Sequence, residues 1–362
     1  MDRYNIWFAY VMGVNCINSL EIIQSGYSPR EFYADRENLR WYRVFTERQM
    51  ETAAATTLDD VEKICKAHEK HGIKSMNYLD EIFPQRLKEI PHAPLVLFYK
   101  GNPGILAEKY TVAVVGSRRC NGEGERACSL IAADVAKLGG VVVSGLAQGI
   151  DTVAHRACVE NGGRTVAFTG VPLDECFPKS NEKFQKKLEE EHLVISEYVS
   201  GYEYHGTNFI FRNRLIAGAG DGLCVVQAKN RSGSLATVGK AIEYDKPVFT
   251  VPGSIFSPAY EGSNRLLTEG KAMAVTDGVQ IMKYLGAEIP DEKENKKEKK
   301  PDTSMLSEMA QQVLNTMDGA MFSSRIVKSS GKPAGLVKAA ITELEISGFI
   351  IKTDNGEYIR KK

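Results

Sequence analysis

Glycine, serine and basic side chains recur where short β-branched runs of this sequence end. Segments rich in these residues follow the runs Thr111–Val115 and Leu223–Val226, and the segment between residues 205 and 214 carries further arginines. The candidate residues in these places are Gly116, Ser117, Arg118, Arg119, Arg212, Asn213, Arg214, Ser232, Gly233 and Ser234. Glycine lets a backbone approach a ligand closely, and free N–H groups at helix N-termini attract anions. These residue types therefore suit the binding of phosphate groups.

Two further loops extend this group. The run Val141–Val143 leads into one loop and the run Thr165–Phe168 into another, and their candidate residues are Gly145, Gly149, Lys179 and Asn181. In an open α/β sheet the loops that leave the strands lie along one edge, where ligands bind. We therefore expect an arginine-rich edge, with Phe209 beside Arg212 as a surface on which an unpaired base can stack. Single-stranded nucleic acid fits this combination better than a lone nucleotide.

Each of these features also has a purely structural interpretation. Gly116–Arg119 lacks the GxGxxG spacing of a dinucleotide-binding turn, so it is also typical of an ordinary strand-to-helix turn. Ser232–Ser234 is equally compatible with a helix N-cap, which serine favours. Phe209 and Phe211 stand two residues apart, and both core packing and base stacking remain open for them.

The sequence contains no recognisable catalytic motif. No HExxH, GxSxG or Walker sequence occurs. Asp151 and His155 are four residues apart on a predicted helix, but without a nucleophile or a third ligand a structural hydrogen bond between them is the favoured interpretation. We therefore expect a binding protein and not an enzyme, with no cofactor and no metal.

Short apolar runs alternate with amphipathic helices over the middle of the chain. The six predicted strands are Thr111–Val115, Val141–Val143, Thr165–Phe168, Leu193–Ile195, Leu223–Val226 and Val248–Val251. Strands that alternate with helices form a parallel sheet covered on both faces. The predicted fold class is therefore α/β, with a Rossmann-like doubly wound parallel sheet over residues 76–287.

Three other segments complete the expected domain organisation. Residues 1–75 predict a small helical module of the SAM or helix-hairpin-helix type. Residues 288–303 are almost purely charged and predict a solvated linker. Residues 304–362 contain three helix-like segments followed by a hairpin around Asn355–Gly356, the order of a winged helix. From Gly319 onward this module has eight Lys or Arg against four Asp or Glu, which leaves nucleic-acid contact and protein docking equally open.

Composition limits the possible partners and compartments. The 46 Lys and Arg residues balance 46 Asp and Glu residues, so a polyanion must be held by a local basic patch. The seven cysteines are odd in number and form no CxxC pair, which argues against a disulfide framework and favours a reducing cytosol. The apolar run Ile6–Val14 is too short to span a bilayer. We therefore expect a cytoplasmic protein without a membrane partner.

With these motifs assembled, the chain resembles the DprA (Smf) family of DNA-processing proteins. The resemblance rests on VAVVGSRR at 112–119, VSGLAQGID at 143–151, FPKSN at 177–181, RNRLIAG at 212–218 and SGSL at 232–235. These motifs occur in family order over about residues 95–285. The helical N-terminal module and the C-terminal winged helix also match the family's layout.

The resemblance implies a function and partners. Family members bind single-stranded DNA and load the RecA recombinase during natural transformation, and they form homodimers. Carried over to this chain, the DNA contacts are Arg118, Lys179, Arg212 and the glycine and serine backbone around them. The segment Tyr204–Asn208 lacks a basic residue that many members carry before the RNR motif. Gly13–Cys16 lacks the GxG hairpin of many relatives, so we expect a packing role for the N-terminal module.

Two alternative functions remain open, one enzymatic and one with the same DNA binding in another cellular role. The first is a LOG-type phosphoribohydrolase that hydrolyses nucleotides on a similar sheet. Its PGGxGTxxE signature is the discriminator, and here the loop reads Pro252-Gly253-Ser254-Ile255-Phe256 with Glu261 at the wrong spacing. The second is a DprA-like binder of single-stranded DNA that serves genome maintenance or defence instead of transformation.

Overall fold

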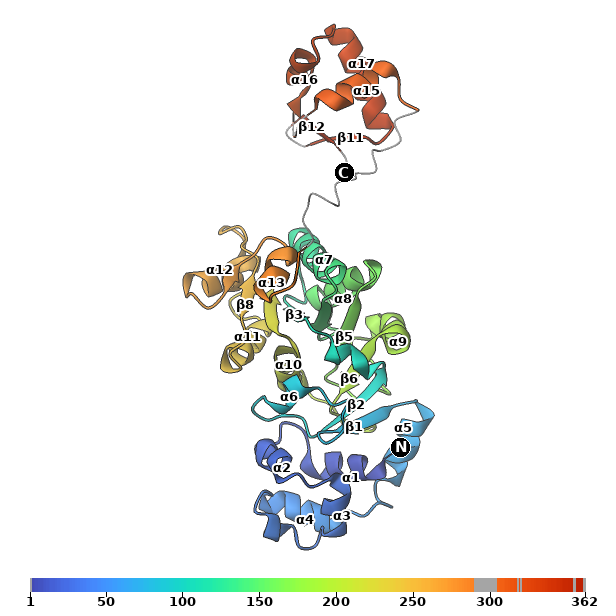
Figure 1. Ribbon diagram of the computed structural model, residues 1–362, viewed down its shortest axis with the longest axis vertical. Helices are drawn as coiled ribbons and strands as arrows, with labels where there is room; N and C mark the ends of the chain where they lie inside the picture. Colours follow the sequence, from blue (N-terminus) through green and yellow to red (C-terminus); the bar gives the residue numbers. More distant parts are fainter. Residues whose placement is uncertain (1, 290–304, 318, 320, 354–355, 361–362) are drawn as a thin grey trace. The chain divides into compact units, whose positions relative to one another are not determined.

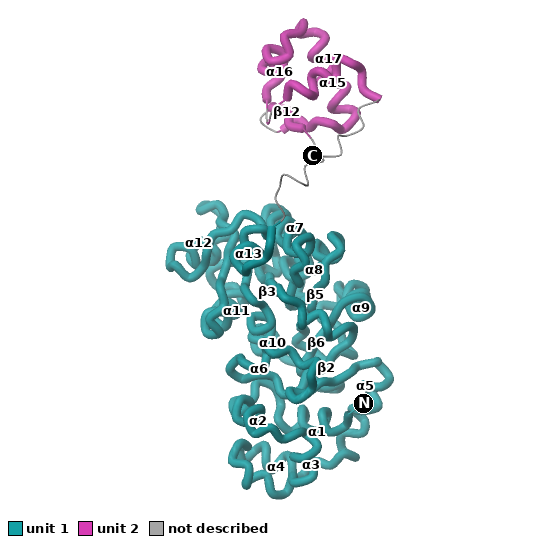
Figure 2. The backbone as a smooth tube through the Cα atoms, in the orientation of Figure 1, with its two compact units in different colours: residues 1–289 teal, residues 290–362 magenta. Residues whose placement is uncertain are grey.

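The computed structural model describes residues 2–289, 305–317, 319, 321–353 and 356–360, so nearly all of the expected linker 288–303 lies outside the described residues. The chain divides into two compact units, residues 1–289 and 290–362 (Figure 2). The expected boundary between residues 75 and 76 therefore does not separate two compact units.

A nine-stranded sheet is the centre of the first unit (Figure 1). Its strands, in chain order, are β1 (Lys74–Asn77), β2 (Val96–Gly101), β3 (Thr111–Val115), β4 (Val141–Ser144), β5 (Arg164–Phe168), β6 (Leu193–Ser196), β7 (Gly222–Val225), β8 (Val248–Thr250) and β9 (Met273–Ala274). The spatial order is β1-β2-β6-β5-β4-β3-β7-β8-β9. In this spatial order, each strand from β6 through β3 to β9 is parallel to the next. At the other edge, β2 pairs antiparallel with β6, and β1 pairs antiparallel with β2. The predicted doubly wound sheet is confirmed, and β1, β2 and β9 were not among the predicted strands.

Helices cover both faces of this sheet. They are α6 (Gln85–Lys88), α7 (Gly122–Lys137), α8 (Ile150–Glu160), α9 (Glu182–Glu191), α10 (Gly206–Ala219), α11 (Ser234–Glu243), α12 (Glu261–Thr268) and α13 (Gly278–Tyr284), with short 3-10 turns at η2 (Pro103–Ala107), η3 (Lys179–Asn181) and η4 (Pro258–Tyr260). Side chains alternate along a strand, so Val112 and Val114 pack with α7, α8 and α13, whereas Ala113 and Val115 pack with α6, α10 and α11. Burial on both faces explains the continuous apolar runs from which the strands were predicted.

The order of the strands creates a topological switch point beside β3. The chain runs outward from β3 through β4 and β5 to β6, then returns to place β7 on the other side of β3. The loops that follow β3 and β7 therefore leave the sheet in opposite directions and open a crevice between them. In sheets of this kind ligands bind in that crevice.

The N-terminal helices share a hydrophobic core with the sheet. They are α1 (Arg3–Met12), α2 (Ser19–Ser25), α3 (Pro29–Ala34), η1 (Leu39–Tyr42), α4 (Glu47–Ala55) and α5 (Glu62–Lys70). The buried rings of Trp7 and Phe8 belong to the same cluster as Phe98 of β2 and Val194 of β6. Because this core is continuous, the predicted packing role of residues 1–75 agrees with the arrangement.

The second unit combines helices with a small antiparallel sheet. Its elements are α15 (Glu308–Thr316), β10 (Met321–Phe322), α16 (Ser323–Ser330), α17 (Ala334–Ile346), β11 (Ile350–Lys352) and β12 (Glu357–Arg360). Strand β12 lies between β10 and β11 and is antiparallel to both. Ala310, Ile326 and Leu344 join the three helices in a small core of their own. This is the element order expected for a winged helix, with β10 as an addition to the predicted elements.

Two further observations concern the described residues as a whole. Among them, no helix is both long enough and apolar enough to cross a membrane. All seven cysteines are free thiols, and most of them are buried.

Two of the expected ligand-binding residues stabilise the fold. Arg214 donates from Nη1 and Nη2 to the carboxylate of Glu197, at 2.6 and 2.7 Å, and its Nε donates to the carbonyl of His92 at 3.0 Å. Both side chains of this pair are buried. Asn181 is also buried, and its amide donates to the carbonyl of Leu146 and to the hydroxyl of Thr152. Burial and these bonds hold both side chains inside the core, and the ligand contact expected of Arg214 and Asn181 stays a prediction.

The prediction of a hydrogen bond between Asp151 and His155 is wrong. His155 is fully buried, and its Nδ1 lies 2.6 Å from Oγ1 of Thr165. The Thr165 hydroxyl donates to the carbonyl of Val142, so it accepts from His155, whose ring is neutral with the proton on Nδ1. Burial lowers the pKa of His155 to about 3. The histidine therefore links α8 to β5 and has no acid–base partner in Asp151.

Replacing Arg214 by methionine should lower the free energy of unfolding by about 3–5 kcal/mol, because Glu197 is left buried without a countercharge. Urea denaturation of the full chain measures the change. Arg265→Met is the matched control, since Arg265 pairs with Glu269 on the surface and its loss should cost at most about 1 kcal/mol. Equal losses in the two variants would contradict the proposed importance of burial.

The buried His155 should make stability fall on acidification. Its folded pKa of about 3 lies below the unfolded value near 6.5, so between these pH values the unfolded chain binds the extra proton. Unfolding free energy should therefore decrease from pH 6.5 downward, by at most about 1.4 kcal/mol per pH unit from this group. His155→Asn keeps a donor for Thr165 and removes the titration, so its urea-denaturation series between pH 7 and pH 5 should have a shallower slope. An unchanged slope would argue against this assignment.

Candidate nucleic-acid interface

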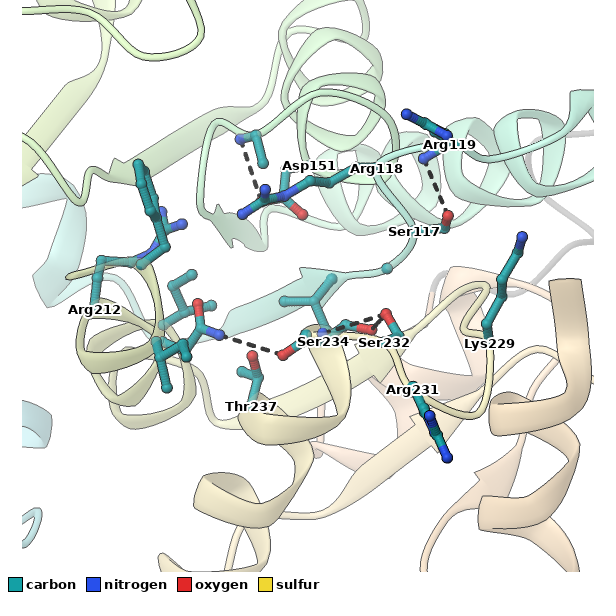
Figure 3. Close-up of a pocket in the computed structure, with 18 of the residues that line it drawn as sticks. Ser117, Arg118, Arg119, Asp151, Arg212, Lys229, Arg231, Ser232, Ser234 and Thr237 are labelled. Atoms are coloured by element: carbon teal, nitrogen blue, oxygen red, sulfur yellow. Dashed lines mark hydrogen bonds between the residues drawn. The ribbon is translucent and has the colours of Figure 1, made fainter. Parts of the chain in front are cut away.

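A cavity of about 490 Å³ opens at the carboxyl ends of β3 and β7, at the topological switch point. Five cationic side chains line it, and Asp151 is the single carboxylate among the described lining residues; the cations are Arg118, Arg119, Arg212, Lys229 and Arg231 (Figure 3). All of these cations except Arg212 are exposed. The cavity is therefore a local basic patch on a chain whose total charge is zero.

The turn after β3 supplies two of these cations. The N–H of Ser117 donates to the carbonyl of Gln227 at 2.8 Å, and the Ser117 hydroxyl accepts from the N–H of Arg119 at 3.1 Å. The first bond ties the turn to the segment after β7 and the second closes the turn itself, while the side chains of Arg118 and Arg119 stay exposed. A Cβ atom at Gly116 would lie 2.6 Å from Ile150, and Gly149 has φ +78° against the carbonyl of Ser117. Gly116 therefore lines the cavity, whereas Gly149 lets α8 begin directly behind the turn.

Arg212 is the buried cation of the site. Its Nη1 donates to the carbonyl of Gly145 at 2.5 Å and to that of Phe168. A Cβ atom at Gly145 would lie 2.5 Å from this guanidinium and 2.7 Å from the carboxylate of Asp151, so only glycine permits the arrangement. Burial lowers the pKa of Arg212 to about 10, opposed by the charge of Asp151. The guanidinium remains charged at neutral pH, and its Nε has no partner among the described residues.

Asp151 balances part of this charge from the floor of the cavity. Its carboxylate accepts from the N–H of Ala147 at 3.4 Å. Burial raises the pKa of Asp151, and the positive charges of Arg212 and Arg118 oppose that shift. One carboxylate among five cations leaves an excess of positive charge, so the site is suited to an anion.

A smaller cavity of about 100 Å³ adjoins the first and has aromatic walls. Its lining includes Gly145 and the side chains of Phe177, Phe209, Arg118 and Arg212. The ring centroids of Phe177 and Phe209 are 4.9 Å apart, and the Arg118 guanidinium lies 5.7 Å from the centroid of Phe209. Phe209 is half-buried in this wall and Phe211 is exposed, so neither is a fully buried core residue.

The start of α11 forms the opposite side of the larger cavity. Gly233 precedes the first helical residue, and the hydroxyls of Ser232 and Ser234 lie 2.7 Å apart. Asn213 of α10 lines the cavity too, and its amide donates to the carbonyl of Gly233 at 3.5 Å. Gly233 occupies the N-cap position of α11, but the Ser232 hydroxyl accepts from the N–H of Ser234 at 3.4 Å, so the capping and binding interpretations of this serine both stay open.

The structure brings most of the expected site residues together and leaves some apart. Those that line one or both cavities are Gly116, Ser117, Arg118, Arg119, Gly145, Phe209, Arg212, Asn213, Ser232, Gly233 and Ser234. Lys179 is exposed next to Pro178 of the smaller cavity but lines neither one, so its role stays a prediction. Lys229 and Arg231 were missed as binding residues. Their position directly after a predicted strand was the available signal, since Ser232–Ser234 was chosen from the same loop.

Comparison with known proteins agrees with this geometry. The DNA processing protein DprA of Streptococcus pneumoniae is 41% identical over 250 residues, which cover 69% of this chain and 84% of that protein. The protein Smf of Escherichia coli is 32% identical over 284 residues, covering 77% of this chain and 75% of that protein. The matched regions thus include most of both relatives.

Solved structures give the same result for the fold. The crystal structure of DprA from Streptococcus pneumoniae superposes with a TM-score of 0.67 at 33% identity, covering 80% of this chain and 99% of that one. A structure that describes the single-stranded DNA binding mode of DNA processing protein A from Helicobacter pylori gives 0.53 at 27% identity, covering 59% and 95%. The sequence model of the DNA recombination-mediator protein A family matches residues 74–286, which contain the whole site, and the chain belongs to this family.

Proposed function

We propose that this protein binds single-stranded DNA in the cavity at the switch point. The observation that carries the proposal is the gathering of five cations around one carboxylate at the ends of β3 and β7. A single strand presents a regular row of phosphates and unpaired bases, so it needs a basic groove with aromatic surface beside it. The similar DNA processing protein A from Helicobacter pylori, whose structure is described as giving insight into its single-stranded DNA binding mode, supports the same ligand here.

Some site residues attract the phosphates of the strand by their charge, and others fix the position of the strand. Exposed Arg118, Arg119, Lys229 and Arg231 neutralise phosphates along the rim, which releases counterions from the strand. Arg212 is fixed by two carbonyl oxygens and holds its charge at the back of the cavity. The N-terminus of α11 adds N–H groups and the positive end of its dipole. The Phe177–Phe209 wall receives the base next to the bound phosphate.

We also propose the finer role that the family resemblance implies. The protein hands the bound strand to the RecA recombinase during natural transformation, and it acts as a homodimer in the cytoplasm. Its membership of a recombination-mediator family and its seven free thiols support this role and this compartment. Lys179 beside the smaller cavity remains a candidate contact for the outgoing strand. No enzymatic step is part of the proposal.

The salt dependence of binding to an oligothymidylate should report each phosphate contact. Log affinity falls with log salt by about 0.7 for every phosphate neutralised on a single strand. Arg118→Ala and Arg231→Ala should each reduce the slope by about this amount, and fluorescence anisotropy at several salt concentrations measures it. Arg126→Ala is the matched control, because Arg126 is exposed on α7 and lines neither cavity. A slope that stays unchanged in both cavity variants would refute DNA binding at this site.

Strand exchange tests the hand-over to RecA. When single-strand binding protein already covers the DNA, the wild-type protein should restore exchange by the cognate RecA, because it displaces that cover and presents the strand. The Arg118→Ala/Arg231→Ala double variant should lose the stimulation, while Arg126→Ala keeps it. If the wild-type protein binds DNA but does not stimulate exchange, the mediator role fails and DNA binding stands.

A further inference from the structure

A short turn after β8 holds the two most exposed large apolar side chains of the described residues of the first unit. Ile255 is 81% exposed and Phe256 is 91% exposed. Neither side chain belongs to the cavities or to a hydrophobic core cluster. Burying such a ring against a partner would be favourable, so the fixation and the surroundings of this turn decide whether it is a contact site.

This turn is fixed to the domain at its base. The N–H of Gly253 donates to the side-chain oxygen of Asn264 at 3.1 Å, and the Asn264 amide donates back to the carbonyl of Gly253 at 3.0 Å. A Cβ atom at position 253 would lie 2.0 Å from the buried ring of Tyr260, so the backbone passes directly over that ring. The chain therefore leaves β8 along a path that only glycine allows.

The tip of the turn is closed by its own hydrogen bonds. The N–H of Ser257 donates to the carbonyl of Ser254 at 3.1 Å, and the N–H of Phe256 donates to the Ser254 hydroxyl at 3.3 Å. The N–H of Tyr260 then donates to the carbonyl of Ser257 at 3.0 Å. A closed turn on a fixed base leaves the backbone at Phe256 little conformational freedom to lose on binding.

The turn is continuous with the basic rim of the larger cavity. Helix α12 starts just after it and lies beside β8 (Figure 1). The N–H of Gly262 donates to the carbonyl of Ala228 at 2.8 Å, and the hydroxyl of Ser263 accepts from the N–H of Ala228 at 2.9 Å. These bonds join α12 to the segment that carries Lys229 and Arg231 on the cavity rim (Figure 3). The nearby carboxylate of Glu261 accepts from the Asn230 amide at 3.4 Å.

We propose that Phe256, supported by Ile255, is a second contact for the same strand, on which a base that leaves the cavity past Lys229 stacks. This inference rests on the proposed function. Single-stranded nucleic acid is the occupant that the surroundings favour, because exposed Lys229 and Arg231 lie on the segment bonded to the start of α12, the helix that follows the turn, and can contact the strand's backbone. A base offers a flat face of the same size as the ring, whereas two apolar side chains are a small area for a protein interface.

The test compares oligothymidylate with an abasic oligonucleotide of equal length, using the full chain and fluorescence anisotropy. Phe256→Ala should weaken binding of oligothymidylate by about 5- to 150-fold, the range for loss of one base–aromatic stack. It should leave the salt slope and the affinity for the abasic strand unchanged, since no phosphate contact is lost. Phe256→Trp should retain binding, and its added fluorescence should be quenched by oligothymidylate.

Controls separate this inference from the proposed function. Ile17→Ala removes another exposed apolar side chain, 71% exposed and outside both cavities, and should change neither affinity. If Arg118→Ala flattens the salt slope but Phe256→Ala binds oligothymidylate normally, the second contact is refuted and the cavity stands. Equal weakening on the abasic strand would also refute stacking. If Arg118→Ala and Arg231→Ala both leave the slope unchanged as well, the proposed function itself fails.

Discussion

The site depends on one buried cation. Arg212 is placed inside the domain by the carbonyl oxygens of Gly145 and Phe168 and faces the carboxylate of Asp151. A buried charge is costly unless hydrogen bonds and a countercharge compensate it. Here the ends of β4 and β5 supply the oxygens and α8 supplies the acid, so the guanidinium links α10 to these three elements at the edge where the ligand is expected. The exposed arginines of the cavity add charge to a frame that Arg212 already holds.

The RNR motif shows what sequence reasoning can and cannot resolve. Three polar residues in a row on one helix point in directions about 100° apart. Arg212 therefore faces the cavities, Asn213 reaches toward α11, and Arg214 lies in the core against Glu197. The motif correctly predicts a basic helix at the edge of the sheet where the ligand is expected, but it carries no information on the partner of each guanidinium. Glu197, which decides the role of Arg214, comes from a loop that is distant in the sequence.

The same limit explains the other differences between expectation and structure. The six parallel strands were predictable because both faces of each are buried, which produces unbroken apolar runs. Strand order is not encoded in those runs, so the switch point between β3 and β7 became visible only in three dimensions, whereas the position of Lys229 and Arg231 after a predicted strand was already an available signal. The N-terminal helices read as a separate module because their own pattern is amphipathic. Their apolar faces pack on Phe98 and Val194, and no local pattern reveals that destination.

Burial also determines how the cations respond to salt. At physiological ionic strength exposed charges are screened beyond roughly 8 Å, so Arg118, Lys229 and Arg231 act only on phosphates close to them. The overall charge of zero adds no long-range attraction that could compensate. Arg212 is buried, so salt screens its charge less than the charges of the rim. A phosphate that Arg212 neutralises would still release counterions from the strand, so a contact at the back of the cavity would add to the salt dependence as a rim contact does. Burial of Arg212 therefore changes the reach of its charge and not the number of counterions that binding releases.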